Sequence, residues 1–350
     1  MNLARFLAIP AVWAFTLSFA ADGGDQHRIT IDEAAQCLGL SAQQMAEVRA
    51  GKIVSTDFPE LTDKELAITV AMLVDLPIAD LAEAVRGSEL LESNPNFLLF
   101  EDLGDEDPSE ADFVDVEFDG DEASEIRGLL GAKPGSEFNL SAEEILGFEG
   151  LRKRFPGSCE RDPECPADVV QEYRRVLLDR LRAYRRGGTE AVAPYARGGG
   201  SVASPGEELR TAAQGCALIR DRLPELHRAL VDYPRSSIEG FEHRFFWVKQ
   251  RVRDRPAFVL KHGMLYQRPD ALLGVEREFY VGHSYNSLLV MAGCLPLENQ
   301  TLVFYINRTS TDQVAGVAKD MRHSMGRKHM RAQVVTSLEK IRAEIENGAE

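Results

Sequence analysis

The sequence predicts an α+β protein: an antiparallel sheet, a long C-terminal helix and a large helical insertion. Three observations indicate this. Strand-like runs separated by turn-forming residues lie between residues 51 and 103 and again between residues 245 and 307. Helical periodicity dominates residues 123–235. An amphipathic segment of about 30 residues ends the chain, and its apolar stripe must pack against another layer.

The first twenty residues have the pattern of an export signal. A short basic segment, Met1–Arg5, precedes the apolar run Phe6–Leu17, and small residues follow at Ser18–Ala20. We therefore expect residues 1–20 to be a signal peptide and the mature chain to begin near Ala21, in the periplasm or outside the cell. The apolar run has only about 12 residues, and a bilayer-spanning helix needs about 20, so no stable membrane span is predicted.

The N-terminal part of the mature chain is predicted to contain two short helices and then the first strands of the sheet. Thr30 and Ser41 are placed as N-caps of helices within residues 21–50. Residues 51–108 should supply the first strands, with one helix between them. The expected strands are residues 51–56, 66–74 and 96–103, and the expected helix is residues 78–86.

The segment Glu101–Glu125 holds 13 acidic residues and no basic one. Asp115, Glu117, Asp119 and Gly120 resemble the start of a calcium-binding loop. Ile126, however, occupies the twelfth position, where such a loop needs a bidentate Glu. We favour a strand at 114–118, because apolar and acidic residues alternate there.

Residues 109–235 are expected to form an acidic and helical insertion. A capping box begins at Ser141, and the strongest helix runs from Pro166 to Arg186, ending at two glycines. Gly198–Ser201 is interpreted as a link, because no strand precedes it and no Lys follows as a phosphate-binding loop requires. The other expected helices are residues 123–130, 205–219 and 223–231.

Residues 236–346 should complete the sheet and add the terminal helix. Four strands are expected, at residues 245–252, 257–266, 276–291 and 300–307. The helix is expected over residues 313–346. Six apolar residues are available for one face of it: Val317, Met321, Met325, Val334, Leu338 and Ile341.

Charge and cysteine content narrow the function classes. Residues 1–150 carry a net charge of −23 and residues 151–350 carry +7, so the acidic half disfavours nucleic acid as a partner. Cys159 and Cys165 enclose a polar loop and are predicted to form a disulfide in an exported protein. Cys37, Cys216 and Cys294 are expected to be small buried residues. No Cys/His spacing predicts a metal, and no cofactor is expected.

The order of these elements resembles the START-related helix-grip family, in which a curved sheet wraps the last helix around an apolar cavity. The likeness covers residues 51–108 and 236–346. Five stretches are also similar to segments of an uncharacterised family of exported bacterial proteins: residues 203–209, 224–227, 245–249, 280–289 and 304–308. The START resemblance implies an antiparallel helix-grip sheet that binds or carries an apolar small molecule or lipid.

A polar group in such a cavity would orient the ligand. In the expected strand His283, Tyr285 and Ser287 share one face, and Trp247 and Tyr305 are further candidates for ligand binding. The alternative interpretation is that all five are polar groups satisfied within the core or at the surface. His262 and Tyr266 are expected to be core or surface residues.

Two other functions stay open. His283 and Ser284 are adjacent on a strand and face opposite ways, so they do not form a base and its nucleophile, and no nucleophile elbow is present. A helix-grip enzyme using His283 and Tyr285 as acid and base is one alternative, although we expect binding rather than catalysis. An envelope interaction or scaffold protein is the other. A large apolar cavity favours binding or catalysis, whereas an exposed apolar patch favours the scaffold.

Overall fold

A computed structural model describes residues 29–81, 97–104, 106–156, 159, 164–268 and 270–348, with side chains up to residue 343. The predicted signal peptide lies outside the described residues. Eight described strands form one antiparallel sheet in the order β1-β2-β10-β9-β8-β7-β6-β3. The strands are β1 (Val54–Asp57), β2 (Glu65–Val74), β3 (Phe97–Asp102), β6 (Phe241–Val252), β7 (Arg255–Arg268), β8 (Ala271–Val281), β9 (Ser287–Leu297) and β10 (Gln300–Ser310).

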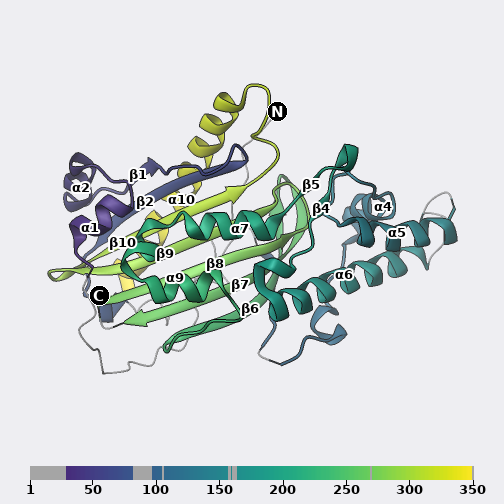
Figure 1. Cartoon of the computed structure of the whole chain (residues 1–350), viewed down its shortest axis with the longest axis horizontal. Coiled ribbons are helices and arrows are strands. Elements are labelled where there is room, and N and C mark those ends of the chain that lie inside the picture. The colour runs from purple at the N-terminus through teal and green to yellow at the C-terminus, as the bar shows by residue number, and fades with distance from the viewer. Residues whose placement is uncertain are drawn as a thin grey trace.

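Helices cover both sides of the sheet (Figure 1). One side carries α7, which contacts β8, β9 and β10, while α10 lies behind the sheet and contacts β1 and β2. The group α4 to α6 extends beyond one end of the strands. The helices are α1 (Ile31–Cys37), α2 (Ala42–Arg49), α4 (Ala123–Leu130), α5 (Ala142–Arg154), α6 (Cys165–Gly187), α7 (Pro205–Gln214), α8 (Ala217–Arg222), α9 (Pro224–Val231) and α10 (Lys319–Gly348). The chain is therefore a mixed α+β protein with a large antiparallel sheet and a long C-terminal helix, as predicted.

Several helices begin where the sequence places them. The side chains of Thr30, Ser41 and Ser141 each accept a hydrogen bond from the backbone N–H three residues later. The backbone N–H of each cap residue in turn donates to the side chain of Glu33, Gln44 or Glu144. These capping boxes satisfy two backbone N–H groups that a helix start otherwise leaves unpaired. The helix after Ser141 continues to Arg154, and the expected helix 205–219 is divided at Gly215 into α7 and α8. The expected helix 78–86 is helical at residues 78–81, and the rest of it lies outside the described residues.

The sheet separates two apolar clusters. On the α7 side, the cluster includes Phe245, Trp247 and Phe258 and continues into the helical insertion. On the α10 side it includes Val248, Val259 and Val290 of the sheet. Met330, Val334 and Leu338 of α10 pack into that second cluster. Fully burying one such side chain stabilises a fold by about 1.5–3 kcal/mol, so both clusters hold the sheet in place.

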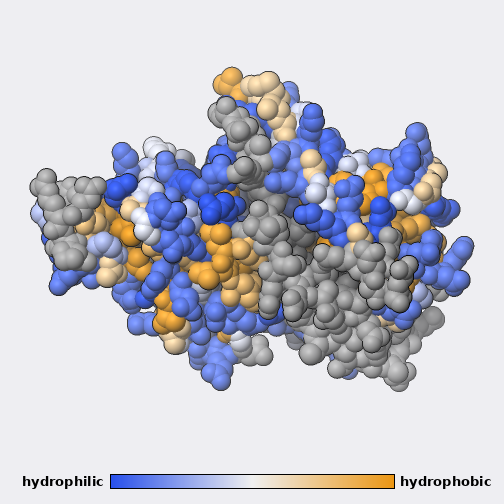
Figure 2. Space-filling model, turned by 180° about the vertical axis from the view of Figure 1, so that it is seen from behind, coloured by the Kyte–Doolittle hydropathy of each residue, from blue (hydrophilic) through white to orange (hydrophobic). Residues whose placement is uncertain are grey.

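The predicted apolar stripe of the last helix is correct only in its second half. The helix begins at Lys319 rather than residue 313, and Val334 and Leu338 are buried. Val317, Met321 and Met325 are exposed, at 88%, 61% and 47%. Figure 2 shows apolar atoms at the top of the molecule, where the chain enters α10. At about 100° per residue, Met321 and Met325 lie on the helix face opposite to Val334 and Leu338, so the six residues do not form one stripe. The inward face of the first turns carries His323 instead, which is 7% exposed.

The predicted strand at 114–118 is wrong. A 3₁₀ helix, η1 (Glu110–Phe113), precedes this segment, which has no strand partner. Arg174 of α6 donates to the carbonyls of Val114 and Val116 instead, at 2.5 and 3.1 Å. Of the three apolar residues in the alternating pattern, Val116 is buried and Phe118 is half-buried, whereas Val114 is 54% exposed. A side chain thus binds the backbone groups that a neighbouring strand would otherwise pair.

The acidic tract pairs with cationic side chains of the sheet. Lys249 of β6 contacts Asp119 and Glu122 at 3.0 and 2.7 Å. Arg255 of β7 contacts Glu125 at 2.7 Å. These ion pairs join the insertion to the sheet, and Asp119 of the segment that resembled a calcium loop has a structural role here.

The predicted disulfide is confirmed. Cys159 and Cys165 are bonded, with Cα atoms 5.0 Å apart. Cys216 and Cys294 are free and buried as expected, whereas Cys37 is only half-buried. Burial raises the pKa of the Cys216 thiol to about 11 and that of Cys294 to about 12, so both stay protonated and inert. Of the helices in the described part of the chain, none is long and apolar enough to cross a membrane.

Candidate functional site

The five candidate site residues do not share one face of the sheet. The expected single strand 276–291 is two strands: β8 ends at Val281 and β9 begins at Ser287. The connection between them includes Ser284 with φ of +78°, a left-handed conformation. Strand alternation therefore does not apply to residues 282–286. Tyr285 packs in the apolar cluster on the α10 side, whereas His283 packs against Phe138, which belongs to the other cluster.

His283 is a satisfied core residue. Its Nε2 lies 3.0 Å from the carbonyl oxygen of Pro256, which only accepts, so Nε2 donates. Its Nδ1 then accepts from the Ser284 hydroxyl at 2.7 Å. Burial, with a smaller contribution from Arg255, lowers the pKa of His283 to about 4. The imidazole is therefore neutral and has a structural role.

Trp247 and Ser287 join other elements to the sheet. The indole of Trp247 donates to the carbonyl of Asp112 at 2.9 Å, and the hydroxyl of Ser287 donates to Glu208 of α7 at 2.9 Å. His262 is buried too, as expected, with Nδ1 2.9 Å from the hydroxyl of Tyr184. Burial holds the pKa of His262 well below its usual range. These residues lie on the α7 side and form part of the packed core.

A network of charged and polar side chains lies on the α10 side of the sheet, and Tyr285 belongs to it. We call this set the central network: Gln250, Lys261, Glu276, Glu278 and Tyr285. Its members come from β6, from β7, from β8 and from the β8–β9 connection. All five residues are at most 2% exposed, in a mainly apolar face of the sheet.

The contacts of the central network are short and directional. The ammonium of Lys261 lies 3.0 Å from Glu276 Oε1 and 2.7 Å from Glu278 Oε1. The hydroxyl of Tyr285 donates to Glu278 Oε2, and Gln250 Nε2 donates to the Tyr285 oxygen at 3.0 Å. The Lys261 ammonium also lies 5.1 Å from the centre of the Phe97 ring, which adds a cation–π contact.

Electrostatics keep Lys261 charged and Tyr285 neutral in the central network. Burial by itself would lower the pKa of Lys261, but the carboxylates of Glu276 and Glu278 outweigh it and raise the pKa. Burial and the neighbouring Glu278 carboxylate raise the pKa of the Tyr285 hydroxyl well above its usual range. Lys261 is therefore an ammonium and Tyr285 a neutral donor at physiological pH. Tyr305, the remaining candidate, is buried in the same cluster, and Asn307 approaches its hydroxyl at 3.4 Å.

Sequence analysis missed four members of the central network. Lys261 was present in an apolar strand, and Glu276 and Glu278 are two residues apart in another, so both strands carry charge on one face. A charged residue on the strand face where the apolar pattern places buried side chains indicates a buried ion pair, because burying an unpaired charge is costly. Their meeting depends on the register between β7 and β8, with Lys261 opposite Glu278, and the sequence does not give this register.

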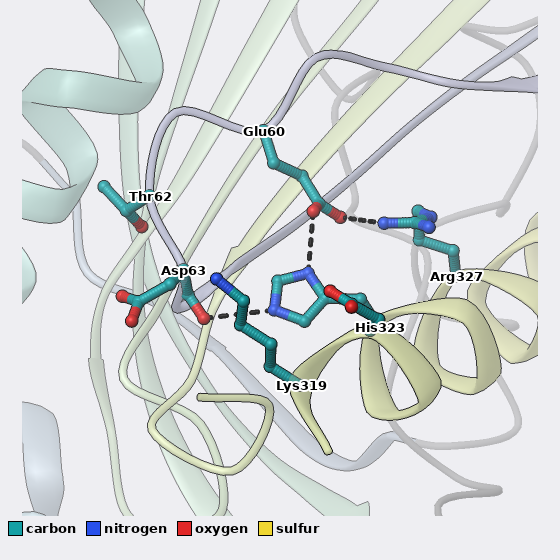
Figure 3. A pocket seen from close by; sticks show the side chains of 7 residues that line it. Glu60, Thr62, Asp63, Lys319, His323 and Arg327 are labelled. Atoms are coloured by element: carbon teal, nitrogen blue, oxygen red, sulfur yellow. Dashed lines mark hydrogen bonds and ion pairs between the residues drawn. The ribbon is translucent and has the colours of Figure 1, made fainter. Parts of the chain in front are cut away.

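A separate pocket of about 320 Å³ lies at the start of α10 (Figure 3). His323 places Nδ1 2.7 Å from Glu60 and Nε2 3.0 Å from the carbonyl of Asp63, and Arg327 also binds Glu60 at 2.7 Å. The side chains around the pocket are Glu60, Thr62, Asp63, Lys319, Asp320, His323 and Arg327. Its walls are polar and carry both charges, so it does not match the predicted apolar cavity. These contacts fasten α10 to the β1–β2 connection.

No family model matches this chain, and no curated protein matches it significantly. In the described part of the chain, no group of three or more His, Cys, Asp or Glu side chains is placed to hold a metal ion. The chemistry of the central network and the apolar cluster around it therefore carries the functional argument.

Proposed function

We propose that this protein is exported and binds an apolar small molecule or lipid on the α10 side of its sheet. The ligand would lie between the sheet and α10 as in a helix grip, with its polar end at the central network. One observation carries the proposal: a cluster of ionised and polar groups is buried within an apolar face of the sheet. Apolar pockets with a few convergent polar groups are typical of small-molecule sites.

The energetic cost of the central network supports this proposal. Removing an ion from water costs several kcal/mol, and replacing buried ion pairs by apolar residues is often neutral or stabilising. Lys261 and Glu278 belong to neighbouring strands that main-chain hydrogen bonds already join, so their contact adds no new connection between distant segments. A binding role gives a reason for placing charge at this position.

An acid–base pair of His283 and Tyr285 is disfavoured by the geometry. The two side chains enter different apolar clusters, and both nitrogens of His283 already have hydrogen-bond partners.

The scaffold alternative has one observation in its favour, the exposed apolar residues Val317, Met321 and Met325. Export is supported by the Cys159–Cys165 disulfide, since disulfides persist in oxidising compartments.

Native mass spectrometry of the protein purified from its own host tests the binding proposal. We expect a bound mass that is lost on denaturation and that lipid extraction recovers. The Tyr285→Phe variant should retain less of it, because this change removes a hydroxyl from the central network. The matched control is Ser287→Ala, which removes a hydroxyl on the opposite side of the sheet. A wild-type protein that carries no adduct and binds no added alkyl ligand would refute the proposal.

A further inference from the structure

The hydrogen bonds of the central network fix the orientation of the Gln250 amide. Tyr285 has one hydroxyl hydrogen and donates it to Glu278. The Tyr285 oxygen therefore accepts, and the group that donates to it is the Gln250 NH₂, at 3.0 Å. A flipped amide would bring two acceptor oxygens together, so Gln250 Oε1 points away from Tyr285.

Gln250 Oε1 is a buried acceptor without a donor. Gln250 is 1% exposed, and Oε1 has no hydrogen-bond partner among the residues that the structure describes. A buried carbonyl left in this state costs about 1–3 kcal/mol. Few buried polar side chains in native proteins lack a hydrogen-bond partner, and each case requires an explanation.

None of the donors of the central network bonds Gln250 Oε1. The ammonium of Lys261 faces the carboxylates of Glu276 and Glu278, and the hydroxyl hydrogen of Tyr285 is given to Glu278. On the same face of β10, Asn307 donates to the Tyr305 hydroxyl at 3.4 Å and Thr309 donates to Asn307 at 2.8 Å. The group that pairs with Gln250 Oε1 must therefore be a hydrogen-bond donor from outside the central network.

We propose that the polar end of the bound ligand is a hydrogen-bond donor, an alcohol or an amine, received by Gln250 Oε1 beside Tyr285 and Glu278. This inference rests on the proposed function and adds the head-group chemistry to it. A carboxylate head has no hydrogen to give at neutral pH, and it would add a third carboxylate beside Glu276 and Glu278. The site therefore discriminates against fatty acids and in favour of hydroxylated or amino amphiphiles.

A chain-matched series tests this inference on the full mature protein. Binding of 1-decanol, decylamine and decanoate is measured by calorimetry at pH 7.5, where the carboxylate is ionised. We expect 1-decanol or decylamine to bind about tenfold more tightly than decanoate, the effect of one satisfied hydrogen bond. The difference between 1-decanol and decylamine shows which donor the site prefers. In Gln250→Leu the preference over decanoate should fall towards one, whereas Ser287→Ala should keep it.

The outcomes separate the two proposals. If none of the three compounds binds to the wild-type protein, the proposed function fails. If decanoate binds as tightly as 1-decanol and decylamine, the protein binds alkyl chains but the head-group inference is wrong. An unchanged preference in a folded Gln250→Leu variant overturns the role of Gln250. The wild-type series decides the head-group chemistry even where that variant does not fold.

Discussion

The two sides of the sheet use buried charge differently. On the α7 side, charged side chains join the sheet to the segments that cover it: Lys249 binds the acidic tract, and Arg308 of β10 binds the carbonyl of Gly215, which follows α7. On the α10 side, Lys261 pairs with Glu276 and Glu278, which lie on the neighbouring strand. The first arrangement ties the insertion to the sheet. The second adds little to the architecture, which is why the α10 side is the better candidate for binding.

The largest effect is expected from Lys261→Met. This change leaves buried carboxylates without their ammonium, and breaking a buried ion pair in this way costs about 3–5 kcal/mol. The matched change on the other side, Lys249→Met, should cost less, because its partners Asp119 and Glu122 are 74% and 11% exposed and are therefore better compensated by water than Glu276 and Glu278, which are at most 1% exposed. Urea denaturation of both variants measures the two free energies of unfolding. Equal losses would remove the distinction drawn between the two sides of the sheet.

The second prediction concerns the pH dependence contributed by the α7 side. The pKa of His283 is about 4 in the folded protein and about 6.5 when exposed, so between these values the unfolded chain binds the extra proton. The contribution of His283 is therefore complete above pH 6.5 and is lost as the pH falls to 4. The loss is roughly 3 kcal/mol over this window.

His283→Gln provides the control for that prediction. The Gln side chain retains a donor for the Pro256 carbonyl but does not titrate, so the stability of the variant should change less between pH 6.5 and pH 4. Parallel denaturation curves for wild type and variant across this range measure the difference. Identical pH profiles would show that His283 is protonated without cost and is not buried as described.

These comparisons show what the sequence could and could not specify. Local signals placed most elements, because capping boxes and apolar periodicity act within a few residues. They failed at residues 114–118, where Arg174 from α6 takes the backbone carbonyls. They failed again at residues 282–286, where alternation was extended through a turn. Tyr285 was a candidate from the sequence. Its partners come together only because of the register between neighbouring strands, which the sequence does not give, so the central network could not be predicted.

A smaller effect is expected from removing the disulfide. Cys159 and Cys165 are six positions apart, so the bond closes a short loop and restricts the unfolded chain only modestly. The Cys159→Ala/Cys165→Ala double variant should lose about 2 kcal/mol of stability. Thermal denaturation with and without reductant checks this: reductant should destabilise the wild type and leave the double variant unchanged. If reductant has the same effect on both proteins, the stabilisation comes from elsewhere.

The smallest effect on stability is expected at the start of α10. Met321 and Met325 are exposed, so replacing both by Ser should change the free energy of unfolding by no more than about 0.5 kcal/mol each. Val334→Ala, in the second half of the same helix, removes methyl groups from the buried cluster and should cost about 1–3 kcal/mol.

The same pair of variants separates the proposed binding function from the scaffold alternative. A ligand-binding protein should keep its alkyl ligand when Met321 and Met325 are replaced and should bind it less well in Val334→Ala, because α10 covers the sheet through Val334. If ligand binding is unaffected by Val334→Ala while the Met321 and Met325 changes abolish an interaction with another protein, the exposed first turns of α10 are the functional surface and the binding proposal is wrong.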